Sequence, residues 1–299
     1  MKEVFALIIS KAWKRKVQNS KKLLRQYRHL FEMSTPYQSS VIDGLHLLSY
    51  NPLEPAFLSL MQSYGKHNYP TKGPYAESYS LGCVTLLFGP RFPKVAPYKI
   101  KINPSEGGLS LQQVLDWATF ASGNANNLHV RRVDFKVDLF NYNPVHCMNR
   151  IWASGFRTLD DRFKNQSLYL GGKRSSKTIL IYDKATQQKI PKNIHLDWTR
   201  VEVREKYDKQ NQLSLPVFLQ NLRLICPFQD LVMIDAEQAE LDALLVKYKK
   251  SVIADSVVKT LKALNTYQKK VILKKLDDMG KLSYLTTDYD KQLQDWLIY

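Results

Sequence analysis

The chain has 299 residues, 44% of them hydrophobic, which suits one large domain or two ordinary ones and excludes wholesale disorder. Its 44 Lys and Arg residues against 27 Asp and Glu give a formal charge of +17. That surplus disfavours a small-molecule enzyme and favours a polyanionic partner, either nucleic acid or an anionic membrane surface. No stretch approaches the roughly 20 apolar residues of a membrane span, so a membrane role shrinks to peripheral binding.

The three cysteines, Cys83, Cys147 and Cys226, lie far apart in the sequence. An odd, scattered set offers neither a disulfide framework nor a zinc signature. We therefore expect a reducing, cytoplasmic environment.

The first predicted element is a basic helix over residues 2–32, which a break at Ser34-Thr35-Pro36 ends. Its basic side is either a solvated face of a helix docked on the core or a surface that lies against DNA phosphates. The two interpretations are compatible.

The next part of the chain is predicted as strand, helix, two strands and helix. The hydrophobic patterns place these elements at 41–50, 54–64, 78–88, 98–102 and 111–120, with a loop at 65–75 and a turn at 104–108. A similar order follows, with strands at 129–139, 167–171, 178–182 and 195–205 and helices at 145–153 and 215–222. This echo predicts an α+β fold in which two related halves form one central antiparallel sheet flanked by helices.

From about residue 236 apolar residues recur at helical spacing with many lysines between them, ending in a helix at 289–296. Segments 252–264 and 267–276 fit a helix-turn-helix-like unit or a helical cap on the sheet, with the cap slightly favoured. The predicted domains are a basic N-terminal helix (1–35), a catalytic domain (36–225) and a helical basic C-terminal region (226–299).

Two strands carry alternating charged residues. In the first, Arg132, Asp134 and Asp138 share one face, opposite an apolar face. Two carboxylates there are costly unless they are paired, with Arg132 and Lys136, or bind a metal ion. In the second, Arg200, Glu202 and Arg204 share a face. That pattern fits an ion-pair ladder, or a site that binds phosphate and a cation.

A third segment, 168–184, is predicted to form a β-hairpin that ends in Tyr182-Asp183-Lys184. Its loop carries glycines, serines and basic residues, and such a loop can approach a phosphate backbone closely. Spacing does not decide whether Tyr182 faces the core.

These segments, in this order, resemble the Rep_trans family of plasmid and phage replication initiation factors, which includes some relaxases. The family pattern is R-x-D-x-x-x-D, then Y-x-G-x-x-x-S with I-Y-[DN]-K, then R-x-E. The positions that match it here are Arg132, Asp134, Asp138, Tyr169, Gly171, Ser175, Ile181, Tyr182, Asp183, Lys184, Arg200 and Glu202. Two positions depart from the pattern: Leu180 stands where the family commonly has Arg, and Arg204 stands where it often has an acidic residue.

The resemblance implies a rolling-circle replication initiator that nicks and rejoins origin DNA. Tyr182 would attack the scissile phosphate, form a 5′-phosphotyrosyl link and release a 3′-OH. Mg²⁺ or Mn²⁺ held by Asp134, Asp138 and Glu202 would stabilise the added negative charge, and Lys184 would lower the pKa of Tyr182 if it lies close. His129 is either an extra ligand or, in the interpretation we favour, a structural histidine.

The resemblance also implies partners. Origin DNA would be single-stranded at the nick and duplex around it, and a host helicase and a second copy of the chain are further expected partners. The residues expected to contact DNA are Arg132, Lys173, Arg174, Ser175, Lys177, Arg200 and Arg204.

Two other functions fit parts of the pattern. A non-catalytic origin-binding or regulatory protein explains the charge without needing Tyr182. A metal-dependent nuclease that hydrolyses DNA with water needs the carboxylates but not the tyrosine.

Overall fold

The computed structural model describes residues 40–156, 162–164, 167–172, 175–189, 196–250, 252–253 and 256–297. The predicted basic helix at 2–32, and with it the expected first domain, lies outside these ranges. So do Lys173 and Arg174 of the hairpin loop.

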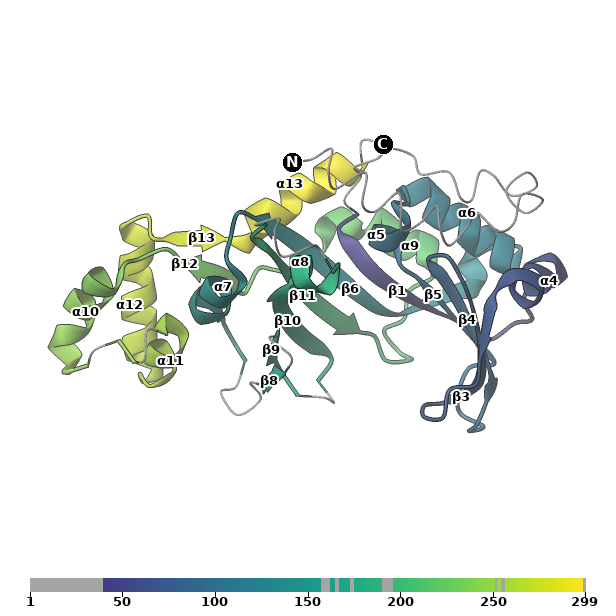
Figure 1. Ribbon diagram of the computed structural model, residues 1–299, viewed down its shortest axis with the longest axis horizontal. Coiled ribbons are helices and arrows are strands. Elements are labelled where there is room, and N and C mark those ends of the chain that lie inside the picture. The colour runs from purple at the N-terminus through teal and green to yellow at the C-terminus, as the bar shows by residue number, and fades with distance from the viewer. Residues whose placement is uncertain are drawn as a thin grey trace. The chain divides into compact units, whose positions relative to one another are not determined.

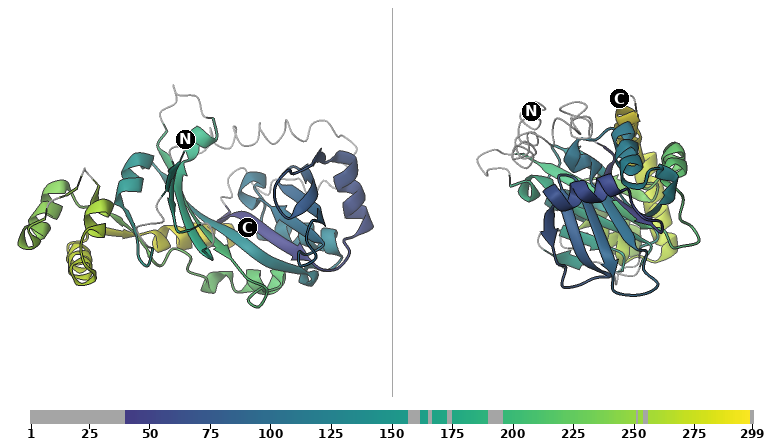
Figure 2. Two further views of the ribbon diagram at one scale, coloured as in Figure 1. Left: turned by 90° about the horizontal axis from the view of Figure 1, so that it is seen from below. Right: turned by 90° about the vertical axis from the view of Figure 1, so that its right-hand side faces the viewer.

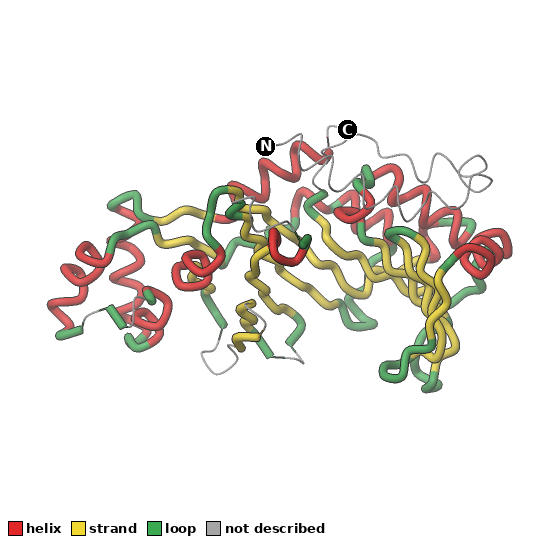
Figure 3. The backbone as a smooth tube through the Cα atoms, in the orientation of Figure 1, coloured by secondary structure: helices red, strands yellow, loops and turns green. Residues whose placement is uncertain are grey.

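The described residues form an α+β fold with a large antiparallel sheet flanked by helices, which confirms the predicted fold class (Figure 1, Figure 3). Ten strands hydrogen-bond in the order β2-β3-β4-β5-β1-β6-β11-β10-β9-β8. Contacts divide the chain into two compact units. Unit 1 comprises the residues up to Phe135, Arg204–Ile225 and those from Lys291 on, and unit 2 comprises Lys136–Val203 and Cys226–Asp290. Strands β6 and β11 contribute residues to both units.

Unit 1 contains five complete strands, and α4, α5 and α6 pack on one side of them (Figure 2). Its elements are β1 (Ile42–Ser49), α4 (Pro55–Tyr64), β2 (Lys66–Asn68), β3 (Tyr75–Leu81), β4 (Val84–Pro90), β5 (Tyr98–Ile102), α5 (Pro104–Gly107), α6 (Leu111–Ser122), η1 (Ala125–Asn127), the first part of β6 (Leu128–Phe140), the end of β11 (Trp198–Lys206), α9 (Leu215–Gln220) and η3 (Leu222–Leu224).

Local sequence explains where several of these elements begin and turn. Helix α6 starts at a capping box, in which the Ser110 hydroxyl accepts from the Gln113 amide at 3.2 Å and the Gln113 side chain accepts from the Ser110 amide at 3.0 Å. The single strand predicted at 78–88 is wrong, because β3 and β4 form a hairpin there. Gly82 makes the two-residue turn feasible, since its φ of 58° is one that other residues rarely adopt.

Three smaller predictions also need correction. The loop at 65–75 includes β2, and the turn at 104–108 is the single helical turn α5. The helix expected at 145–153 ends at Arg150, and its last three residues form strand β7.

Unit 2 holds the other end of the large sheet, a three-stranded sheet in the order β13-β12-β7, and a helical region with its own core. Its elements are the end of β6, α7 (Pro144–Arg150), β7 (Ile151–Ala153), β8 (Arg162–Lys164), β9 (Ser167–Leu170), β10 (Lys177–Asp183), α8 (Lys184–Gln187), the start of β11, β12 (Leu231–Ile234), α10 (Gln238–Leu245), η4 (Val246–Tyr248), α11 (Val257–Lys262), α12 (Thr266–Asp278), β13 (Leu282–Tyr284) and the start of α13 (Leu285–Leu297).

The helical region bears on the helix-turn-helix question. Helices α11 and α12 are separated by only three residues, 263–265. Val257 and Leu261 of α11 and Ile272 and Leu276 of α12 are buried in a common core. A short link of that length is found in helix-turn-helix units. Whether this pair contacts DNA stays a prediction.

Candidate active site

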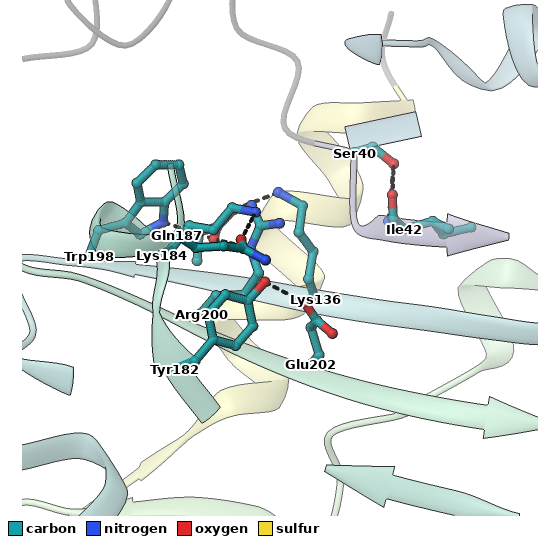
Figure 4. A network of polar contacts seen from close by, with 10 residues as sticks. Ser40, Ile42, Lys136, Tyr182, Lys184, Gln187, Trp198, Arg200 and Glu202 are labelled. Atoms are coloured by element: carbon teal, nitrogen blue, oxygen red, sulfur yellow. Dashed lines mark hydrogen bonds and ion pairs between the residues drawn. The ribbon is translucent and has the colours of Figure 1, made fainter. Parts of the chain in front are cut away.

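Polar side chains from three neighbouring strands of unit 2 gather on one face of the large sheet (Figure 4). Strand alternation puts Lys136 and Asp138 of β6 on the same side, and it does the same for Trp198, Arg200 and Glu202 of β11. The opposite side of these strands carries Val137, Val201 and Val203, all fully buried. From β10, Tyr182 points to the polar side.

Asp138 is the centre of a buried ion cluster. Its Oδ1 accepts hydrogen bonds from Arg200 Nε at 2.7 Å and from Trp198 Nε1 at 2.9 Å. Its Oδ2 accepts from Lys136 Nζ at 2.5 Å and from Arg200 Nη2 at 2.9 Å. Burial alone would raise the pKa of Asp138, but the Arg200 and Lys136 cations hold it well below its usual range. The cluster is therefore ionised and carries one net positive charge.

Tyr182 and Glu202 form a second buried pair beside this cluster. The tyrosine hydroxyl donates to Glu202 Oε1 at 2.5 Å, and the two residues are 5% and 2% exposed. A tyrosine is a poor nucleophile while it keeps its proton, since its ordinary pKa is about 10. A carboxylate at hydrogen-bond distance is the kind of group that can accept that proton.

Lys184 lies next to the tyrosine ring as the first residue of α8. Asp183 caps this short helix by accepting from the Thr186 amide at 3.0 Å, which fixes where strand β10 stops. Lys184 Nζ is 5.8 Å from the centre of the Tyr182 ring and donates to Gln187 Oε1 at 2.6 Å. The structure thus places the two predicted catalytic residues close together.

The three predicted metal ligands have protein donors as partners. Asp134, in unit 1, accepts both of its 2.6 Å hydrogen bonds from Arg132, Asp138 lies in the ion cluster, and Glu202 pairs with Tyr182. Within the described ranges, no group of three or more His, Cys, Asp or Glu side chains is arranged to hold a metal ion. In this arrangement cations occupy the oxygens of Asp134 and Asp138, and a tyrosine hydroxyl occupies one oxygen of Glu202, so a metal ion would have to displace these donors. A requirement for Mg²⁺ or Mn²⁺ stays a prediction.

The expected DNA contacts have different surroundings. Arg200 is 2% exposed within the ion cluster, and Arg204 Nε lies 4.0 Å from Asp134 Oδ2. In the hairpin loop, Ser175 Oγ accepts from the Gly172 amide at 3.0 Å. At the start of β10, Lys177 Nζ lies 3.8 Å from Asp230 Oδ2. Of the described residues in this set, Arg200 is the buried one, and Arg132, Ser175, Lys177 and Arg204 are partly exposed.

His129 has a structural environment. Its backbone forms an isolated bridge with Ser214, and its ring lies 5.9 Å from that of Tyr50 in a tilted arrangement. The sequence pattern offered Lys136 only as an ion-pair partner and gave Trp198 no role, although both bind Asp138. Their strand parity with Asp138 and Arg200 was the available signal.

Comparisons with known proteins give likenesses in structure. No family model and no curated protein matches the chain. A solved structure that resembles it is the rolling circle replication initiator protein from Geobacillus stearothermophilus, with 12% sequence identity and a TM-score of 0.43, over 79% of this chain and 94% of that one. At this level of likeness, only the residues of the chain itself can support a proposal about its function. Among the described residues, no helix is long and apolar enough to cross a membrane.

Proposed function

We propose that the protein initiates rolling-circle replication by nicking and rejoining one strand of origin DNA, with Tyr182 as the nucleophile. The observation that carries this proposal is the 2.5 Å hydrogen bond from Tyr182 to Glu202, which pairs the expected nucleophile with a proton acceptor. The motif resemblance supports it, because Tyr182, Lys184, Arg200 and Glu202 fall in its pattern.

In the nicking step, the Tyr182 oxygen forms a bond to the scissile phosphorus as its proton passes to Glu202. The bond from phosphorus to the 3′ oxygen breaks, and that oxygen takes a proton from solvent to become the 3′-OH. The product is a 5′-phosphotyrosyl link. In rejoining, a 3′-OH attacks this link and Tyr182 regains its proton, so no other reactant is consumed.

The neighbouring charges suit a phosphate. Three buried cations, Lys136, Lys184 and Arg200, face two buried carboxylates, Asp138 and Glu202, which leaves one formal positive charge. In a buried setting that charge stabilises added negative charge more strongly than it would in water. The Tyr182 side chain is only 5% exposed, so the reacting state must differ from this one by a movement that uncovers the hydroxyl. Single-stranded DNA is the proposed substrate at the nick, with duplex around it. A host helicase and a second copy of the chain stay expectations.

The test is a covalent adduct. The protein is incubated with labelled single-stranded oligonucleotides that tile its replicon's origin, with and without Mg²⁺ or Mn²⁺, and run on a denaturing gel. We expect an adduct with the wild type and none with Tyr182→Phe. Tyr248→Phe is the matched control, because the Tyr248 hydroxyl is buried, has no hydrogen-bond partner among the described residues and lies in the same unit.

Each alternative gives a different result. Cleavage without an adduct would replace the proposal with metal-dependent hydrolysis by water. Binding without cleavage would indicate a non-catalytic origin-binding protein. An adduct that survives Tyr182→Phe would show that another residue is the nucleophile.

A further inference from the structure

A row of polar side chains crosses the sheet of unit 1 on the face opposite the helices. Cross-strand pairing aligns one residue from each of six adjacent strands. The row, from β2 to β6, is Lys66, Ser80, Thr85, Lys101, His46 and Arg132. Because paired residues point to the same side of a sheet, all six side chains share one face.

The other face of these strands is the core. Leu45 and Leu47 flank His46 along β1, and Ile100 and Ile102 flank Lys101 along β5, all at most 1% exposed. The Ser80 and Thr85 hydroxyls lie 3.0 Å apart, which confirms that side chains of the row meet across strands. The middle of the row is half-buried rather than fully solvated.

Cations are concentrated at the middle of the row. Four cations lie there: Lys99 and Lys101, two residues apart on β5, Arg132 of β6 and Arg204 of β11. Asp134 is the carboxylate beside them. These five groups sum to a charge of +3 at neutral pH. Burial first, and then Lys101 and other neighbouring cations, lowers the pKa of Lys99 to about 8. Cations crowded this closely repel one another, so the arrangement costs stability unless an anion binds.

His46 gives a second sign of a missing partner. Its Nδ1 is buried and has no hydrogen-bond partner within the part of the chain that the structure describes. Burial, followed by the charges of Lys99, Arg132, Lys101 and Arg204, lowers its pKa to about 2, so the ring is neutral. The neutral tautomer with its proton on Nδ1 offers a donor amid cations, a place where a phosphate oxygen, or a water bound to one, would be stabilised.

We propose that this face of unit 1 is a DNA-binding surface that contacts backbone phosphates, chiefly through Lys99, Lys101 and Arg132. Strands lie about 4.8 Å apart, so the six-strand row spans roughly 24 Å. That length meets several phosphates, which repeat about every 3.4 Å along the axis of each strand of a duplex. The inference rests on the proposed function in one respect, the choice of DNA as the polyanion. The residues of the row lie in unit 1 and the Tyr182 site lies in unit 2, so the two proposals use different residues.

The test measures DNA affinity without chemistry. In a Tyr182→Phe background, the full chain is titrated into a labelled 20-nucleotide single strand and into the corresponding duplex, from about 50 to 300 mM NaCl. The variant is Lys99→Gln with Lys101→Gln. The control is Lys94→Gln with Lys209→Gln, two exposed lysines of unit 1 outside the row, which remove the same charge.

We expect the row variant to bind at least about tenfold more weakly near 0.1 M salt, with a salt slope smaller by about 1.4 to 1.8, as for two lost phosphate contacts. The strand form that loses more affinity identifies the DNA that the row holds. The control should change affinity less than threefold. Equal losses in both variants would mean a general charge effect and overturn the proposal, as would binding of anionic phosphatidylserine vesicles, but not DNA, through the same lysines.

Loss of folding is not expected to obscure the result, because removing two mutually repelling lysines should leave the melting temperature unchanged or higher. The two proposals also fail separately. An adduct at Tyr182 combined with unchanged binding by the row variant would reject only the DNA-binding surface. Weakened binding with no adduct in the wild type would reject only the nicking function.

Discussion

The Tyr182 hydroxyl donates its hydrogen bond to Glu202 Oε1 at 2.5 Å, and both side chains are almost fully buried. The two residues come from β10 and β11, which are neighbours in the sheet, so their relative position is held by strand pairing rather than by a loop. The pair therefore links a candidate nucleophile to a carboxylate that the sequence suggested as a metal ligand.

Glu202→Gln tests whether this carboxylate accepts the tyrosine proton. The amide keeps the shape and a hydrogen-bond acceptor but is not a base, so adduct formation should slow by about 10² to 10³. Single-turnover adduct formation measures the rate, and oligonucleotide binding should change little. A rate within threefold of the wild type would show that Glu202 only orients the ring.

Asp138→Asn tests the buried ion cluster. The change removes the carboxylate that Lys136 and Arg200 share, and loss of one partner of a buried pair costs about 3–5 kcal/mol. Urea unfolding at pH 7 measures this loss. Asp138→Leu would be a less informative variant. It places an apolar side chain against two charged ones, so a loss of stability could come from that contact as well as from the lost carboxylate.

The same carboxylate predicts a pH dependence. Its pKa is lowered in the folded protein, so its stabilising contribution is complete above the unfolded value, about 3.9, and is lost as the pH falls below it. Urea midpoints between pH 5 and 2.5 should therefore fall more steeply for the wild type than for Asp138→Asn. Parallel curves would contradict an ionised Asp138.

Strand alternation was the part of the site that the sequence could predict. Arg132 with Asp134, and Arg200 with Glu202, do share faces as spacing required. Strand alternation left two possibilities open for each carboxylate, pairing with a cation or binding a metal ion. Which of them occurs depends on how side chains from neighbouring strands meet, and spacing along one strand does not show that. Because spacing did not decide the direction of Tyr182, the pairing of β10 beside β11 was needed to bring it to Glu202.

The fold was predictable where an element is long or has a clear boundary. The predicted strand at 98–102 matches β5, and α6 extends only two residues beyond its predicted end. The small sheet of β7, β12 and β13 was missed because its strands are three or four residues long and come from distant segments. The row on unit 1 was missed for a related reason, since its residues become neighbours only through cross-strand register.

His46 predicts a loss of stability in mild acid. Its pKa is lowered from 6.5 to about 2 in the folded protein, so below pH 6.5 the unfolded chain binds a proton that the folded chain does not. Stability should fall as the pH drops from 6.5 to 5, by about 1–2 kcal/mol from this residue. In His46→Gln that part of the decrease should disappear, as urea unfolding at the two pH values would show. An equal decrease in both proteins would mean that His46 binds the same number of protons in the folded and the unfolded state, which would contradict its lowered pKa.

Lys99 predicts that DNA binding weakens in mild alkali. Its pKa in the free protein is about 8, whereas a bound phosphate would favour the charged form and raise the pKa. Above pH 8 binding must therefore be accompanied by proton uptake, and affinity should fall by up to about tenfold per pH unit. The charged groups that act on Lys99 are Lys101 on its own strand and Arg131, Arg132 and Asp134 on β6.

Lys99→Arg separates this residue from other titrating groups. The guanidinium stays protonated over the whole range, so the variant should bind DNA at pH 7 about as well as the wild type and keep its affinity at pH 9. Fluorescence anisotropy at pH 7, 8 and 9, at constant ionic strength and in the Tyr182→Phe background, measures both curves. If Lys99→Arg loses affinity as steeply as its parent, the titrating group lies elsewhere. In that case the low pKa of Lys99 has no connection with DNA.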